Sequence, residues 1–287
     1  MQKIVPHLWF DKEAVEAAKF YLSVFDDSEG TFTSHMHDTP SGDVDIVGFK
    51  IMGFEFMAIS AGPYFKLNPS ISFTVSCSSA EAVDELWEKL SLDGEILMEL
   101  GEYPFSPRYG WIQDKYGVSW QIIFFHEMRP EQKIIPHIMF TQDVCGKAEE
   151  AMNFYASIFP DSKVEEIFRY QNQAPDKDGT VVHAFFELGK QKFGAMDSAL
   201  PHEFKFNEAV SFIVNCKNQK EIDYFWEKLS AVPESEQCGW IKDKYGVSWQ
   251  ILPENMNELM SRNPEKTTPA MLKMKKIDIE SLRKTGE

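Results

Sequence analysis

Two histidines and two glutamines stand at matching places in the sequence, and their side chains could do acid–base chemistry. His7 occurs in KIVPHLWF and His137 in KIIPHIMF, while Gln121 and Gln250 lie in two copies of DKYGVSWQI. A neutral imidazole can serve as a general base, and an amide N–H can stabilise a developing oxyanion. These four residues are therefore candidates for metal-free catalysis, although the sequence alone gives a catalytic role to none of them.

The four residues recur because the chain is a tandem duplication. The nonapeptide begins at Asp114 and again at Asp243, and FKLNPSISFTVSC at Phe65 returns as FKFNEAVSFIVNC at Phe204. The offset between the copies is 139 at Phe65 (204 − 65) and 129 at Asp114 (243 − 114), so ten residues are missing from the second copy. The deletion removes the counterpart of EILMELGEYP. We expect it to take away most of one strand and to shorten or open one wall of the second cavity.

The apolar pattern predicts the elements that position these residues. SISFTVS alternates apolar and polar residues, which is typical of a half-buried strand. EAVDELWEKL carries Val83, Leu86 and Leu90 on one stripe, which indicates an amphipathic helix. Each copy therefore has the order strand, helix and three strands, followed by the same order once more.

Composition limits the kinds of partner and compartment. The chain has 45 Asp and Glu residues against 29 Lys and Arg, and its formal charge of −16 argues against a nucleic-acid partner. Its four cysteines form no CxxC pair, which is typical of a reducing compartment. No apolar run approaches the roughly 20 residues of a membrane span. We expect a cytoplasmic protein without a membrane partner.

Several motifs carry a resemblance to a known group of proteins. PHLWF, AAKFY, DELWEKL and GWIQDKYGVSWQI resemble the PhnB-like group of the glyoxalase/bleomycin-resistance/dioxygenase proteins, the vicinal oxygen chelate superfamily. This group is also described as demethylubiquinone methyltransferase-like, but the chain has no strand followed by a Gly-rich loop and helix for a methyl-donor nucleotide. The resemblance implies an α+β fold of two tandem glyoxalase-like domains. Each would pair two βαβββ modules, with curved mixed sheets around a cavity and helices outside.

The resemblance and the repeat limits together predict the domain organisation. We expect a first domain at residues 1–128, a linker at 129–132, a second domain at 133–253 and a helical tail at 254–287. Met271, Leu272, Met274 and Ile277 form an apolar stripe that would pack the tail on one domain. The duplication makes an internal pseudo-dimer, and pairing of two chains into a homodimer stays open.

Metal-dependent members of the superfamily bind a divalent ion with one ligand, usually His or Glu, from each of four strands. The resemblance maps the first and last positions onto Val5 and Gln121 in one copy and onto Ile135 and Gln250 in the other. The positions between them fall on Met57 or Ala58, Ser70, Ala195 or Met196, and Ala209. Aliphatic side chains cannot ligate a cation, and a neutral amide is a weak replacement for a carboxylate. We therefore predict no metal and no other cofactor.

Strand alternation within the implied fold predicts which side chains face the cavities. The expected ligand-binding residues are His7, Trp9, Ser72, Thr74, Ser119 and Gln121 in the first copy, and His137, Met139, Ser211, Ser248 and Gln250 in the second. Trp9 is replaced by Met139, and Thr74 by Ile213, so the second cavity is expected to be less polar.

The sequence favours a metal-independent small-molecule binding protein whose ligand is apolar or aromatic. The alternative is a lyase- or isomerase-like enzyme of the same superfamily. It would use His7 and Gln121, or an unrecognised divalent metal.

Overall fold

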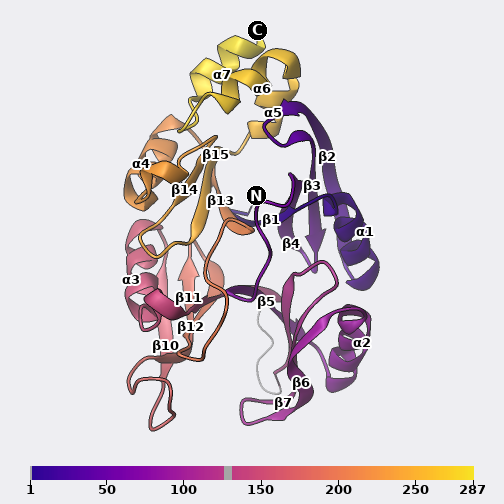
Figure 1. Ribbon diagram of the computed structural model, residues 1–287, viewed down its shortest axis with the longest axis vertical. Helices are drawn as coiled ribbons and strands as arrows, with labels where there is room; N and C mark the ends of the chain where they lie inside the picture. The colour runs from indigo at the N-terminus through magenta and orange to yellow at the C-terminus, as the bar shows by residue number, and fades with distance from the viewer. Residues whose placement is uncertain (1, 126–130) are drawn as a thin grey trace.

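The computed structural model describes residues 2–125 and 131–287, which form two curved mixed sheets (Figure 1). The seven-stranded sheet has the order β14 (Trp240–Lys242), β15 (Ser248–Pro253), β13 (Val210–Cys216), β1 (Ile4–Phe10), β4 (Phe54–Ser60), β3 (Gly42–Ile51) and β2 (Ser28–Thr39). The eight-stranded sheet has the order β10 (Lys163–Arg169), β11 (Val181–Leu188), β12 (Gln191–Asp197), β9 (Ile134–Phe140), β5 (Ile71–Cys77), β8 (Ser119–Phe124), β7 (Ser106–Gln113) and β6 (Glu95–Tyr103).

Four helices cover the flanks of the two sheets. They are α1 (Ala14–Val24), α2 (Ala80–Ser91), α3 (Ala148–Ile158) and α4 (Gln219–Leu229). Figure 1 shows α1 and α2 on one flank and α3 and α4 on the other. Short 3-10 turns lie at Gln142–Val144 and Pro233–Ser235. The α+β fold and the order of the βαβββ modules are as the sequence predicts.

The pairing of the modules differs from the expectation that each repeat closes on itself. β1 pairs antiparallel with β13, so that His7 lies opposite Ser211, and β5 pairs antiparallel with β9, so that Ser72 lies opposite His137. Each sheet therefore joins one module of the first repeat to one module of the second. The two modules of a single repeat lie in different sheets, side by side. Residues that were predicted to line one cavity therefore lie in two different sheets.

The deletion in the second repeat has the predicted structural effect. The eight-stranded sheet ends in the hairpin β6–β7, whereas the seven-stranded sheet ends in β14, which spans only Trp240–Lys242. Because of the exchanged pairing, the shortened wall belongs to the sheet that contains His7 rather than to the sheet that contains His137.

The repeated nonapeptide holds the two modules of each repeat together. The Asp114 carboxylate accepts hydrogen bonds from the Tyr21 hydroxyl of α1 and the Trp120 indole of β8, each at 2.8 Å. Asp243 does the same with Tyr155 of α3 at 2.7 Å and with Trp249 of β15 at 2.9 Å. Since α1 packs on the seven-stranded sheet and Asp114 precedes a strand of the other, this contact bridges the sheets. The motif is structural.

The tail forms three short helices rather than one continuous apolar helix: α5 (Met256–Ser261), α6 (Pro264–Leu272) and α7 (Ile279–Gly286). α6 lies against β2, while the backbone N–H groups of Cys238 and Gly239 donate to the carbonyls of Met274 and Lys275. The tail thus reaches from one edge strand of the seven-stranded sheet to the other edge, beside β14 (Figure 1). Of the predicted stripe, Met271 and Ile277 are buried.

The predicted linker and the predicted end of the first domain include residues that the structure does not describe. Residues 129–130 of the predicted linker and the end of the predicted first domain fall within residues 126–130, of which nothing is described. Among residues 2–125 and 131–287, no helix is both long enough and apolar enough to cross a membrane.

Candidate functional site

Each sheet has an outer face covered by helices and an inner face on the opposite side. Leu8, Phe10 and Trp120 point outward into the main core, as predicted from strand alternation. The predicted ligand-binding residues alternate with them and lie on the inner faces. His7, Trp9, Ser211, Ser248 and Gln250 belong to the seven-stranded sheet, and Ser72, Thr74, Ser119, Gln121, His137 and Met139 belong to the eight-stranded sheet.

The polar groups on the inner face of the eight-stranded sheet satisfy one another. Gln121 accepts a hydrogen bond from the Tyr109 hydroxyl at 2.9 Å and donates its amide N–H to Ser72 Oγ at 2.8 Å. The Trp111 indole donates to Ser119 Oγ at 2.8 Å. These side chains are buried. The network engages the carbonyl and one N–H of the Gln121 amide.

His137 is held at both ring nitrogens. Its Nδ1 lies 2.8 Å from Thr74 Oγ1, and its Nε2 lies 3.0 Å from Nε2 of His183 on β11. Burial, together with His183, holds the pKa of His137 well below its usual range. Sequence reasoning missed His183 because it looked for residues that recur in both repeats. The strand register places Ile46, not a histidine, at the equivalent position of the first repeat.

Apolar side chains fill the rest of this inner face. Tyr109, Trp111, Ile123 and Met139 form a buried cluster of their own, separate from the main core. Met196 and Phe204 pack against this cluster. The inner face of the eight-stranded sheet therefore resembles a second hydrophobic core more than an open site.

The inner face of the seven-stranded sheet is built differently. The His7 ring meets the Trp240 ring edge-on, with 5.5 Å between centroids, and Trp9 lies 6.0 Å from Trp240 and 5.0 Å from Phe65. Gln250 donates to Ser211 Oγ at 3.0 Å. Trp9, Phe65 and Trp240 are only half-buried, and the neighbouring edge strand β14 spans three residues.

His7 is buried at 3% exposure, and its Nδ1 has no hydrogen-bond partner among the described residues. The partners of its counterpart His137 are absent, since Thr74 corresponds to Ile213 and His183 to Ile46. Burial lowers the pKa of His7 from 6.5 to about 3, so the ring is neutral at pH 7. A buried polar atom left without a partner costs about 1–3 kcal/mol, and a hydrogen-bond partner at this atom would remove the cost.

The buried histidines predict that stability declines in acid. In the unfolded chain a histidine titrates near pH 6.5, whereas the pKa falls to about 3 for His7 and to about 4 for His183. The unfolded state therefore binds more protons below pH 6.5, and stability present above that pH is lost as the pH falls toward the folded values. We expect each group to contribute a slope of about 1.4 kcal/mol per pH unit in that window.

Urea denaturation between pH 7 and pH 4 measures this slope. His7→Gln should reduce it by the contribution of one proton, while Trp9→Phe, which alters the same wall without removing a titrating group, should keep the wild-type slope. An unchanged slope in His7→Gln would contradict a neutral, buried His7.

Comparison with known proteins assigns the family. A family model described as 3-demethylubiquinone-9 3-methyltransferase matches residues 2–123 and again residues 132–252. The chain belongs to the 3-demethylubiquinone-9 3-methyltransferase family. Each match to this family runs through strands of both sheets, so one family unit contributes one module to each sheet. No curated protein matches the chain.

Two solved structures illustrate what the chain is similar to. A putative 3-demethylubiquinone-9 3-methyltransferase, PhnB protein, from Bacillus cereus is 40% identical over 43% of this chain and 100% of its own, with a TM-score of 0.41. Glyoxalase I from Zea mays aligns over 90% of this chain and 96% of its own, with 11% identity and a TM-score of 0.56. At that identity the likeness to glyoxalase I shows the fold alone.

The residues of this family member do not fit the metal that the superfamily implies. Val5 lies opposite Ile213, and Ile135 lies opposite Thr74, so hydrocarbon occupies the expected ligand positions of the first strands. Within residues 2–125 and 131–287, no three His, Cys, Asp or Glu side chains gather closely enough to hold an ion. The amides of Gln121 and Gln250 already bond to serines.

Proposed function

We propose that the protein is a metal-independent small-molecule binding protein whose ligand site is the inner face of the seven-stranded sheet. The carrying observation is His7, a buried neutral imidazole beside half-buried aromatic rings, whose Nδ1 has no hydrogen-bond partner among the described residues. Its counterpart His137 has both nitrogens engaged within a filled core. The asymmetry supports one functional inner face and one structural inner face.

The surroundings of His7 indicate the class of ligand. Trp9, Trp240 and Phe65 offer ring surfaces that are favourable for a flat apolar or aromatic molecule. In its Nε2–H tautomer His7 can accept one hydrogen bond at Nδ1, and a ligand with an N–H or O–H group would supply it. Indole and phenol have this combination.

The alternative lyase- or isomerase-like activity has less support. His7 and Gln121 lie in different sheets, so they do not share an inner face. A general base works best when its pKa is near the working pH, and burial lowers the pKa of His7 to about 3. Methyl transfer, which the family description names, would need a methyl-donor site. The described turns from strand to helix, such as residues 11–13 and 78–79, contain no Gly-rich loop.

A thermal-shift screen tests the proposal. Indole and phenol should raise the melting temperature, because a ligand that binds only the folded state stabilises it, and toluene should do so less. His7→Phe, which keeps a ring against Trp240, should weaken indole binding about tenfold, equal to about 1.4 kcal/mol. His35→Phe, on the exposed strand β2, is the matched control and should bind as wild type.

Two results would overturn the proposal. Near-stoichiometric zinc, nickel, manganese or iron in the purified protein would contradict metal independence. Equal binding of indole by wild type and His7→Phe, or no shift with any of the three compounds, would remove His7 from the site.

A further inference from the structure

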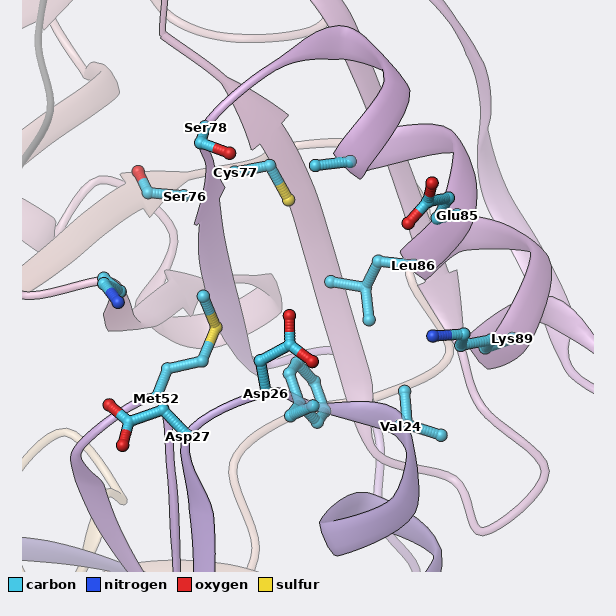
Figure 2. A pocket seen from close by; sticks show the side chains of 13 residues that line it. Val24, Asp26, Asp27, Met52, Ser76, Cys77, Ser78, Glu85, Leu86 and Lys89 are labelled. Carbon is cyan, nitrogen blue, oxygen red and sulfur yellow. The ribbon is translucent and has the colours of Figure 1, made fainter.

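A separate cavity of about 400 Å³ lies away from both inner faces, where the two modules of the first repeat meet. Its floor is apolar and includes Phe25, Met52 and Leu86, and Ser76 and Cys77 line it from the end of β5. Figure 2 shows Met52 and Leu86 on opposite sides, with Asp26 between them. The volume is within the range of about 300–1,000 Å³ that small-molecule sites occupy.

Two residues at the end of β5 line this cavity. Ser76 Oγ is buried and makes no hydrogen bond to any described residue. Beside it, burial raises the pKa of the Cys77 thiol to about 12, so the sulfur stays protonated and is no nucleophile at pH 7. The cavity is therefore suited to non-covalent binding.

The equivalent position in the second repeat carries an aromatic side chain that reaches across the junction. Tyr224, which corresponds to Glu85, crosses the junction and donates its hydroxyl to the Ile158 carbonyl at 2.8 Å. Its ring lies 5.2 Å from the ring of Phe225, which corresponds to Leu86. In the first repeat these two positions carry Glu85 and Leu86, so neither of them supplies an aromatic ring.

An ion pair is also missing at the cavity. At the equivalent junction beside α4, Lys3 of the first repeat pairs with Glu221 of the second at 2.8 Å and lies over the Phe225 ring at 5.0 Å. The corresponding residues at the cavity are Lys133 of the second repeat and Ala82 of the first, so the lysine has kept its place while the carboxylate has been lost. The junction beside α4 therefore shows which groups complete this arrangement: an aromatic ring and a carboxylate.

The mouth of the cavity carries charges of both signs. Asp26 and Glu85 are exposed there together with Lys89 and Lys133, and no ion pair joins any of them to another described residue. Asp26 and Glu85 replace Pro160 and Tyr224 of the second repeat, so both carboxylates are particular to the open copy. A ligand for this mouth would need a positive as well as a negative group.

We propose that this cavity is a second binding site, for a small aromatic zwitterion such as a free aromatic amino acid. The ligand ring packs on Phe25 and Leu86, in place of the ring that Tyr224 supplies in the other repeat. The ligand carboxylate pairs with Lys133, as Glu221 pairs with Lys3. The ligand ammonium faces Asp26 and Glu85. The site is independent of His7.

Isothermal titration with L-phenylalanine tests this assignment. Wild type should bind it saturably, whereas phenethylamine, which lacks the carboxylate, and 3-phenylpropionate, which lacks the ammonium, should each bind at least about tenfold more weakly. Binding of L-phenylalanine should persist in His7→Phe, so this site and the inner-face site can fail separately. No saturable binding up to about 10 mM, weaker than any specific site would show, would overturn the proposal.

The second repeat supplies the variant that closes the cavity. Ala82→Glu combined with Glu85→Tyr gives α2 the residues that α4 already carries, so the fold should be kept while L-phenylalanine binding is lost. Glu88→Tyr, the same change on an exposed position of α2, is the matched control and should bind as wild type. Unchanged affinity in the closed variant, with an unchanged melting temperature, would also overturn the proposal.

Discussion

Replacing Asp114 with alanine should lower the free energy of unfolding by about 3–5 kcal/mol. The Asp114 carboxylate is 4% exposed and accepts four hydrogen bonds, two from the side chains of Tyr21 and Trp120 and two from the backbone N–H groups of Tyr116 and Val118. Alanine would leave these donors buried without an acceptor. It would also remove the connection between α1 and β8, the strand in which the nonapeptide ends.

Urea denaturation followed by tryptophan fluorescence measures this loss. Asp243→Ala should cost a similar amount, because Tyr155 and Trp249 occupy the equivalent positions. Asp143→Ala, at an exposed aspartate, should stay within about 0.5 kcal/mol of wild type. If Asp114→Ala proved as mild as this control, the nonapeptide would not be the connection between modules.

The sequence was sufficient to predict the modules and to predict which side chains of their strands face the helices. The nonapeptide revealed the duplication, and the alternation in β1 and β8 correctly separated Leu8 and Trp120 from the inner-face residues. The missing strand could be inferred from the change in offset, since ten residues are about what one strand and its turn require. These features depend on local pattern, which a single sequence contains.

The pairing between repeats could not be inferred from local pattern. β5 reads ISFTVSC and β13 reads VSFIVNC, so both present nearly the same edge to β1. Side-chain fit and the length of the connecting chain select which strands pair. When two candidate strands are almost identical, their apolar pattern and register do not show which of them is the partner. The strand that pairs with β1 decides whether the deletion shortens the sheet of His7 or the sheet of His137. The difference in environment between these two histidines could therefore not be predicted from the sequence either.

The site residues that sequence reasoning missed share one property. His183 and Tyr109 bond to predicted residues but have no like residue in the other repeat, and Ser76 corresponds to Asn215, whose amide donates to the Gln2 carbonyl. Recurrence identifies what both copies kept, whereas a binding function acquired by one copy appears as a difference. In this chain the informative positions are therefore those at which one repeat satisfies its own polar groups and the other does not.

The second large effect concerns the filled inner face. Gly194→Ala should lower the free energy of unfolding by about 3–4 kcal/mol. A Cβ at Gly194 would overlap the buried ring of His137, which lies directly over it. The ring would have to move and would lose its bonds to Thr74 and His183. At the equivalent place in the other sheet stands Met57, so backbone geometry alone does not require glycine there.

A double-mutant cycle with His137→Ala separates the ring clash from any backbone effect. With the ring removed, Gly194→Ala should cost less than about 0.5 kcal/mol, because alanine is no worse than glycine within a strand. The interaction energy would then be about 3 kcal/mol. An equal cost of Gly194→Ala in both backgrounds would mean that the glycine serves the strand itself. Strong coupling would establish that His137 is fixed as part of a core, as its hydrogen bonds to Thr74 and His183 indicate.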